Sequence, residues 1–362
     1  MIYLICFLLS ALLLHGASKK INRISGKILF ILAALLPILL ATFRSAEVGI
    51  DVHVYVQPYV RRALNASSFA SYFNNMLTSG VEIGYIFLNY IGAVWLGGLS
   101  GVFFLSMLLT IVPVYIRIVG DEDEIPVWVA TSIYLFIFYN LSLNLTRQAI
   151  ALSIVFYAIK YVEDNRWKSF ALLIVIALLF HNSALIGLIY VVLLKISQGK
   201  NWRLKQISIL FLLLIFIVFY NSIFPIIVNL LFSNNADKYL NAFLSDGTGY
   251  LSLWMIVINA FAIICVLFSK KYLLKTNYYK HYILIVTFNF AIYLLTIYNG
   301  NCFRYALYFT IMLPRLVPAV RYRFKQNSRI IADILIVIVF MLYWTNFNLI
   351  SDSYGTVPYY MN

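Results

Sequence analysis

Two arginines at the starts of apolar segments are the residues of this chain best suited to chemistry. Arg147 follows the polar turn 140–146 and precedes an almost wholly apolar run, and Arg304 follows the polar residues 299–301 in the same way. A charged group inside a membrane costs about 2.5 to 3.5 kcal/mol, so it needs a partner. Because guanidinium groups hold phosphate oxygens in pairs, both predict contact with one phosphate or other anion. Arg147 has a second interpretation, in which it ties helix ends together through carbonyl groups or Glu82.

Three further side chains could accept or donate a proton. Asp51 and Glu82 are carboxylates flanking short apolar segments, and His181 stands at the turn between two short apolar runs. Each could act as a general base toward a hydroxyl group, and His181 could also donate to a leaving phosphate. The alternatives stay open: the carboxylates could balance nearby arginines such as Arg44, and His181 could be a hydrogen-bonded packing residue. These residues and His53 lack the tight spacing of a metal site, so no metal is predicted.

The composition places these residues in a membrane protein. The chain has 362 residues, of which 63% are hydrophobic and only 11% charged, far from the averages of soluble proteins. The net charge of +14 lies in short loops between apolar runs, where the positive-inside bias explains it, so no nucleic-acid partner is predicted. The three cysteines form no redox or metal motif. The sequence has neither a dinucleotide-binding motif nor a P-loop, so no cofactor is predicted either.

The apolar runs predict an all-α polytopic protein with about 11–12 transmembrane helices plus outer-leaflet juxtamembrane helices. The predicted spans are 2–15, 28–43, 100–118, 126–142, 146–162, 168–180, 183–195, 206–231, 251–269, 281–298, 303–320 and 329–349. The N-terminal run lacks a cleavage site and is expected to be a retained helix. All the Lys-rich loops can be cytoplasmic only if the run 83–96 does not cross the membrane.

This topology predicts a single integral membrane domain over residues 1–362. Its parts are an outer loop 44–99 with juxtamembrane helices at 67–77 and 83–96, core helices 100–195 that carry candidate catalytic residues, and an outer loop 232–250. The candidate residues then collect at one outer face. They include Arg44, Asp51, Tyr55, Glu82, Asn144, Arg147, Gln148, His181, Lys238, Tyr239 and Arg304. An acidic run, 121–124, remains in a predicted cytoplasmic loop, which is tolerable because acidic residues contribute little to orientation.

Several short motifs in this order resemble the EpsG-type and Wzy-type O-antigen polymerases, which are membrane glycosyltransferases that join lipid-linked polysaccharide repeat units. The motifs are Phe43-Arg44, Gly49-Ile-Asp51 with Tyr55, Glu82 before an apolar stretch, Asn144-Leu-Thr-Arg147-Gln148 and Phe180-His181-Asn-Ser-Ala-Leu185. They cover residues 40–195. The resemblance implies a GT-C-like fold and a site facing the periplasm or cell exterior of a bacterial inner membrane.

The resemblance also implies substrates and roles. The donor would be a growing glycan on undecaprenyl diphosphate, and the acceptor a single repeat unit on the same lipid. Arg147, Arg304, Gln148 and Arg44 would bind the diphosphate, while Asp51, Glu82 or His181 would act in catalysis. Tyr55, Lys238 and Tyr239 are candidate sugar or lipid contacts. A chain-length regulator is a further expected partner.

Other functions fit the same charge pattern. One is a GT-C transferase or an O-antigen ligase that uses a polyprenyl-linked donor. Another is a flippase for lipid-linked sugars, because transporters also place charged residues in membrane cavities. The chain shows no internal repeat, and its unusual charges gather on one predicted face. Both features favour an enzyme over a transporter.

Overall fold

The computed structural model describes residues 1–219, 222–223, 225–226, 229, 252–274 and 278–361. The predicted contacts Lys238 and Tyr239, and the outer loop 232–250 that carries them, lie outside these residues. The described chain forms two compact units, residues 1–187 with 313–362, and residues 188–312. The single domain expected from the sequence stays a prediction.

The described residues are helical without a strand, which confirms an all-α polytopic membrane protein. Five helical segments among them are long and apolar enough to cross a membrane: Ile24–Thr42, Leu99–Gly120, Val127–Asn144, Tyr279–Ile297 and Gln326–Ile350. Shorter apolar helices cover Ile2–Ser18, Ile83–Trp95, Trp167–Leu178, Asn182–Gln198 and Leu253–Phe268. The predicted total of 11–12 spans and the GT-C-like fold stay predictions.

The first unit is a bundle arranged around a buried helix. Its long helices are α1 (Ile2–Ser18), α2 (Ile24–Thr42), α6 (Leu99–Gly120), α7 (Val127–Asn144), α8 (Thr146–Glu163), α9 (Trp167–Leu178) and α19 (Arg329–Trp344). Helix α7 packs against α1, α6, α8 and α19, and all its residues from 129 onward are buried. A helix with apolar or small residues on every side typically occupies such a central, buried position.

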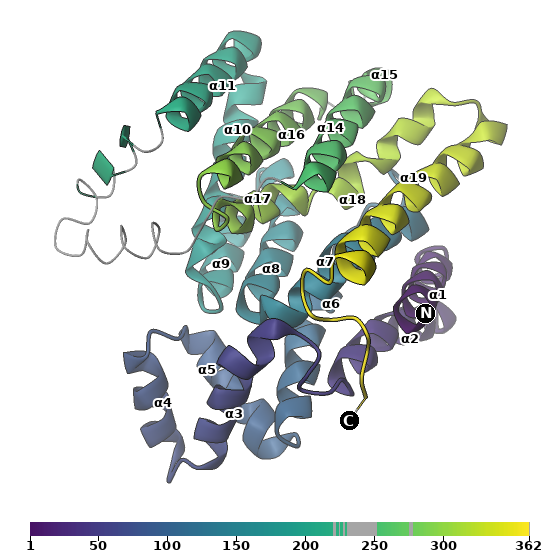
Figure 1. Ribbon diagram of the computed structural model, residues 1–362. Coiled ribbons are helices and arrows are strands. Elements are labelled where there is room, and N and C mark those ends of the chain that lie inside the picture. The colour runs from purple at the N-terminus through teal and green to yellow at the C-terminus, as the bar shows by residue number, and fades with distance from the viewer. Residues whose placement is uncertain (220–221, 224, 227–228, 230–251, 275–277, 362) are drawn as a thin grey trace. The chain divides into compact units, whose positions relative to one another are not determined.

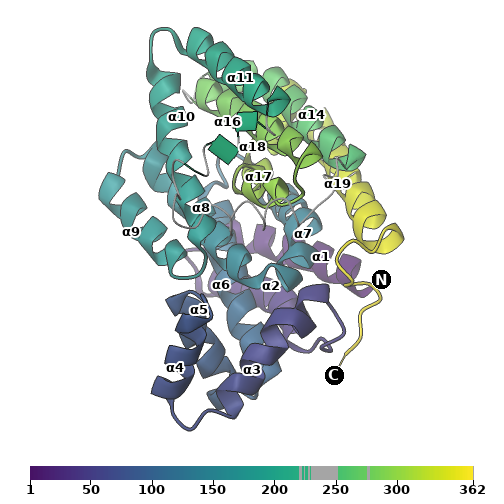
Figure 2. The same ribbon diagram turned by 60° about the vertical axis from the view of Figure 1, so that its left-hand side comes forward.

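Short helices group together at one end of this unit (Figures 1 and 2). They are the π-helix η1 (Val52–Val56), α3 (Gln57–Leu64), α4 (Phe69–Thr78), α5 (Ile83–Tyr90) and the π-helix η2 (Ile91–Trp95). The two short helices expected around 67–77 and 83–96 are therefore present. A span needs about 20 residues, so the length of α5 with η2 fits a segment that does not cross. We call α3, α4, α5 and η2 the end group.

Glycines fold the end group back onto α6. Gly97 and Gly98 have φ angles of 91° and 78°, which glycine adopts without steric cost. Gly92 then lies against the α6 backbone, where an added Cβ would stand 2.7 Å from the Cα of Val102. The chain reverses at Gly97 and Gly98 because their positive φ angles would strain a residue with a side chain, and Gly92 leaves room for the close approach to α6.

The second unit contains α10 (Ile189–Gln198), α11 (Trp202–Val218), α14 (Leu253–Phe268), α15 (Lys270–Leu273), α16 (Tyr279–Leu294), the 3₁₀ helix η5 (Leu295–Ile297) and α17 (Cys302–Thr310). Buried amides join two of its helices, because Asn289 donates to Asn259 at 2.7 Å and accepts from Thr310 at 3.1 Å. Such paired polar groups are tolerated inside an apolar bundle.

The prediction of one continuous span over 303–320 is wrong. The chain there forms α17, α18 (Leu313–Leu316) and the 3₁₀ helix η6 (Pro318–Arg323). Pro314 and Pro318 lie within the first two positions of α18 and η6, where a proline without an N–H group is accommodated, whereas either would interrupt a longer helix. The boundary between the two units falls at this break.

Candidate active site

The turn between α7 and α8 gathers two segments that are distant in sequence. Leu143 accepts a hydrogen bond from Nη2 of Arg44 at 2.9 Å, and the side-chain oxygen of Asn144 accepts one from the backbone N–H of Asp51 at 3.0 Å. Only 2% of Arg44 is exposed, and its guanidinium lies 4.0 Å from the Phe103 ring centroid. Burial lowers the pKa of Arg44 to about 10, so it remains cationic at neutral pH.

The same turn starts α8 with Arg147, which forms an ion pair with Glu82. Nη1 of Arg147 lies 2.6 Å from a carboxylate oxygen of Glu82, the residue before α5. The Arg147 side chain is 27% exposed and that of Glu82 is 10% exposed. The structure therefore contains the contact of the second interpretation, in which Arg147 ties helix ends together through Glu82. The guanidinium group carries five N–H donors, so this contact leaves it with donors for a second anion.

His181 is linked to the Glu82 region through the end of α9. The backbone N–H of Gly84 donates to the carbonyl of Leu179 at 2.7 Å, and an added Cβ on Gly84 would stand at that same distance from the carbonyl oxygen. Nδ1 of the half-buried His181 accepts from the Ser183 backbone N–H at 3.2 Å and contacts the Ser183 hydroxyl at 2.6 Å. A neutral imidazole that accepts at Nδ1 carries its proton on Nε2.

The C-terminal segment closes over the same turn, a contribution that sequence analysis missed. The carbonyl of Gly355 accepts from Gly49 at 2.8 Å, and that of Tyr354 accepts from the side-chain amide of Asn144 at 2.9 Å. Farther along, Tyr360 accepts from Ser45 at 2.8 Å. Residues 354–360 thus hold residues 45–51 against α7.

Asn140 anchors this segment one helical turn before Asn144. Its amide donates to the hydroxyl of Thr356 at 2.9 Å and accepts from the indole of Trp344 at 2.7 Å. Tyr3 donates to the Thr356 carbonyl at 2.7 Å. Asn140 and Asn144 are four residues apart, on one helix face, so both amides can reach the C-terminal segment.

We expect Gly49→Ala to reduce activity while leaving the protein folded. Gly49 has a φ of 110°, and an added Cβ would stand 3.2 Å from the Asn144 amide oxygen that holds Asp51. Such a conformation costs roughly 1–3 kcal/mol for a residue with a side chain. Gly16→Ala is the matched control, because Gly16 has ordinary space around it within α1. The polymerising activity that the sequence resemblance implies, measured in membranes that contain equal amounts of each variant, gives the difference, and equal activities would contradict the expectation.

The remaining predicted contacts lie elsewhere. Gln148 is buried, with 2% of it exposed, whereas Tyr55 on η1 is 46% exposed. Arg304 is exposed near the start of α17, in the second unit. A clamp formed by Arg147 with Arg304 therefore stays a prediction. Within the described residues no cluster of His, Cys, Asp or Glu has the arrangement of a metal site.

The acidic run 121–124 belongs to an ion-pair network at the other end of α8. Two buried arginines, Arg117 and Arg315, are bound by three carboxylates: Asp121, Glu124 and Glu163. Arg315 donates to both oxygens of Asp121 at 2.9 and 3.0 Å, and Arg117 pairs with Glu163 at 2.7 Å. Burial raises the pKa of Asp121 to about 7, against the lowering effect of Arg117. Two members of the run, Asp121 and Glu124, therefore serve as counter-ions to the buried arginines, whereas Asp123 is exposed.

The fold and these residues define a helical multi-pass membrane protein with charged groups at the start of α8, where the end group meets the bundle. The sequence model of the EpsG family matches residues 27–361, so the chain belongs to the EpsG family. The resemblance found in the sequence is thereby confirmed, and the family indicates a polysaccharide-polymerase-like function on a lipid-linked substrate in a membrane. No curated protein and no solved structure matches the chain.

Proposed function

We propose that the protein is a glycosyltransferase that polymerises polysaccharide repeat units carried on undecaprenyl diphosphate, at the outer face of a bacterial inner membrane. The α7–α8 turn carries the proposal, because it joins Arg44, Asp51 and Glu82 to Arg147 within one unit. The products would be O-antigen or a related surface polysaccharide. Family membership supports the reaction class.

Arg147 is the proposed diphosphate ligand. The leaving group of this reaction is a lipid diphosphate, so catalysis requires donors where negative charge develops. Glu82 holds the guanidinium through Nη1 and so orients the remaining N–H groups. Glu82 is then a positioning residue. Arg44 is a second one, because it is buried and its guanidinium holds the Leu143 carbonyl in the turn that precedes Arg147.

Asp51 is the proposed general base. It is half-buried, and within the described part of the chain its carboxylate forms no ion pair. Glu82 is less suited, because its carboxylate is largely buried and already engaged by the Arg147 guanidinium at 2.6 Å. His181 carries its proton on Nε2, so its suitable role is to donate a hydrogen bond to a departing phosphate oxygen.

Purified protein in detergent, supplied with lipid-linked repeat units, tests this proposal. We expect polymer ladders from the wild type and a decrease of roughly 10²–10⁴-fold from Asp51→Asn, the usual contribution of a general base. Glu47→Gln is the control, because Glu47 is an exposed carboxylate only four residues before Asp51. Detergent micelles have no second side, so a flippase would give no product.

The outcomes separate the alternatives. Polymer made at the same rate by Asp51→Asn would leave the function standing and remove Asp51 as the base. Transfer to a lipid A acceptor without chain growth would indicate a ligase, and use of a polyprenyl monophosphate sugar alone would indicate a GT-C transferase of another kind. Absence of any transfer by the folded wild type would contradict the proposal itself.

A further inference from the structure

A polar cavity lies between α3 and α4 in the end group, and none of its lining residues belongs to the α7–α8 turn. It has a volume of about 450 Å³ and is lined by Arg61, Arg62, Asn65, Ala66, Ser71, Tyr72, Asn75 and Ser79. Ligand pockets in proteins measure about 300–1,000 Å³ but are usually apolar. This cavity instead carries a polar group on every lining residue except Ala66. Its ligand should therefore be rich in hydrogen-bonding groups.

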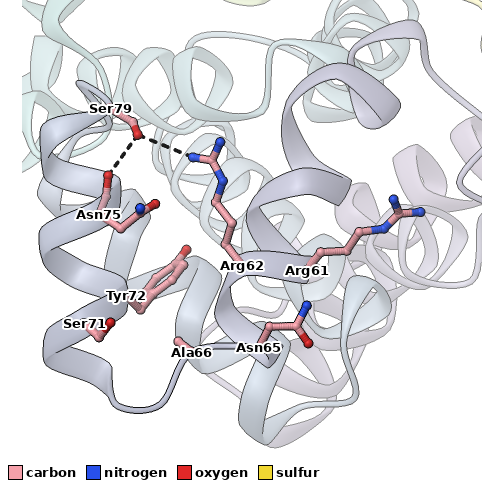
Figure 3. Close-up of a pocket in the computed structure, with 8 residues that line it drawn as sticks. All are labelled: Arg61, Arg62, Asn65, Ala66, Ser71, Tyr72, Asn75 and Ser79. Carbon is pink, nitrogen blue, oxygen red and sulfur yellow. Dashed lines mark hydrogen bonds between the residues drawn. The ribbon is translucent and has the colours of Figure 1, made fainter.

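The charge of the cavity selects an anion. Residues 52–81 include Arg61 and Arg62 but no Asp or Glu. Neither guanidinium forms an ion pair with the residues that the structure describes. Nη1 of Arg62 makes one long hydrogen bond, 3.4 Å, to the Ser79 hydroxyl. Figure 3 shows the Arg62 side chain standing between the two helices, toward Ser79, whereas Arg61 extends to the other side of α3.

The other lining groups match the surface of a sugar. Amides of Asn65 and Asn75 and the hydroxyl of Ser71 can both donate and accept, as sugar hydroxyls do. Tyr72 is 2% exposed, and its hydroxyl donates to Asn89 at 2.9 Å. That bond fixes the ring, which supports the wall of the cavity but is too little exposed to stack on a sugar. A structural explanation of the arginines is that, in the last turn of α3, they stabilise the helix by about 0.3–1 kcal/mol through its dipole. That explanation does not account for the amides that line the cavity.

The cavity lies near the proposed catalytic residues. Ser79 at its edge precedes Glu82 by three residues, and an extended chain spans at most about 3.6 Å per residue, so their Cα atoms are within about 11 Å. Glu82 in turn holds Arg147. A saccharide of a few units bound in the cavity would reach toward that ion pair.

We propose that the α3–α4 cavity binds an acidic sugar of the repeat unit, one that carries a carboxylate or phosphate group, and that Arg62 is its main anion ligand. This inference rests on the proposed polymerase function and names its substrate class. A phospholipid headgroup offers similar anionic chemistry. The saccharide is favoured because the amides and hydroxyls in the cavity outnumber the arginines, and a headgroup phosphate needs few of them.

Binding to purified protein in detergent tests the proposal without requiring catalysis. The probe is a tetrasaccharide of alternating glucuronic acid and N-acetylglucosamine, and its carboxyl-reduced analogue is the neutral match. We expect the wild type to bind the acidic form at least ten-fold more tightly. Arg61→Gln with Arg62→Gln should remove that preference, and Asn75→Ala should weaken both probes. Lys19→Gln with Lys20→Gln removes two adjacent exposed charges elsewhere and should change neither.

Several results would overturn the proposal. Equal binding of the two probes, or no binding of either by the wild type, would exclude an acidic-sugar site. The cavity would be a lipid site if phosphatidylglycerol in nanodiscs raised the thermal stability of the wild type but not of the double glutamine variant, while neither saccharide bound. The double variant Arg61→Lys with Arg62→Lys keeps both charges and should still bind the acidic probe more tightly than the neutral one. That result would show that the loss in the glutamine variant does not come from a folding defect.

The two proposals fail separately. If Asp51 and Arg147 variants still polymerise normally but the acidic probe binds as expected, the cavity is a saccharide site and the catalytic assignment is wrong. If the probe does not bind while those variants lose polymerisation, only the cavity assignment falls.

Discussion

Cells carrying Arg147→Ala are expected to accumulate lipid-linked single repeat units and make no polymer. Loss of one preorganised donor to developing negative charge typically lowers a rate by about 10²–10³-fold. Arg147 is placed for that role because it starts α8 and stays partly exposed while Glu82 holds one of its nitrogens. Gel analysis of lipid-linked and polymeric glycan, at matched protein levels, measures the effect.

A structural role of Arg147 would give the same loss by a different route, because its removal leaves the Glu82 carboxylate largely buried without its partner. The double variant Arg147→Ala with Glu82→Gln separates the two roles. It removes both charges and should recover thermal stability in detergent, since an unpaired buried charge costs more than a missing pair. We expect it to remain inactive. Recovery of polymer by the double variant would contradict the diphosphate role.

Two further variants sharpen this result. Arg147→Lys keeps the charge but not the planar pair of donors, so it should retain only a small part of the activity. Arg166→Ala is the matched control near the opposite end of α8, where the exposed guanidinium lies 4.8 Å from the Tyr161 ring centroid. It should polymerise normally.

The sequence predicted the helical class and the residues at the α7–α8 turn because both leave local signals. Apolar runs mark helices, and an arginine after a polar turn needs a partner whatever the fold. Arg147 was selected in this way, and Arg44, Asp51 and Glu82 were selected as charged residues of the predicted outer loop. The structure links each of them to residues 143–147. His181 is joined to them only through the Leu179 to Gly84 contact.

The C-terminal segment left no comparable signal. Residues 354–360 bind residues 45–49 and 144 mainly through backbone carbonyls, and carbonyl contacts do not depend on side-chain type. The breaks at Pro314 and Pro318 were visible as prolines, but a long apolar run outweighed them. A proline in an apolar run marks a kink in some membrane helices and a boundary in others, so neighbouring helices decide between the two.

The acidic run shows a further limit. Asp121 and Glu124 were treated as loop residues because the sequence gives no indication that Arg315, almost 200 positions later, returns to them. In the structure, α8 extends between two charged sites, with Arg147 at its start and Glu163 at its end. At about 1.5 Å per residue, the 16 residues from Arg147 to Glu163 separate the two sites by roughly 24 Å. The helix therefore joins a candidate catalytic end to a purely structural one.

Arg315→Met is expected to give the largest loss of stability. The Arg315 side chain is 3% exposed and pairs with Asp121, Glu124 and Glu163, so its loss takes an ion-pair partner from three carboxylates. Breaking a buried pair by removing one partner costs about 3–5 kcal/mol. A lower midpoint of thermal unfolding for purified protein in detergent measures the effect.

Neutralising Asp121 in the same background should restore much of that stability. Burial raises the pKa of Asp121 to about 7, which means that holding this carboxylate charged in the fold is itself costly. Asp121→Asn alone should therefore cost less than Arg315→Met, and the double variant should unfold at a higher temperature than Arg315→Met. Asp123→Asn, an exposed member of the same run, should leave the midpoint unchanged. If the double variant is as unstable as the sum of the two single changes, the residues do not act as a network, and the acidic run needs another explanation.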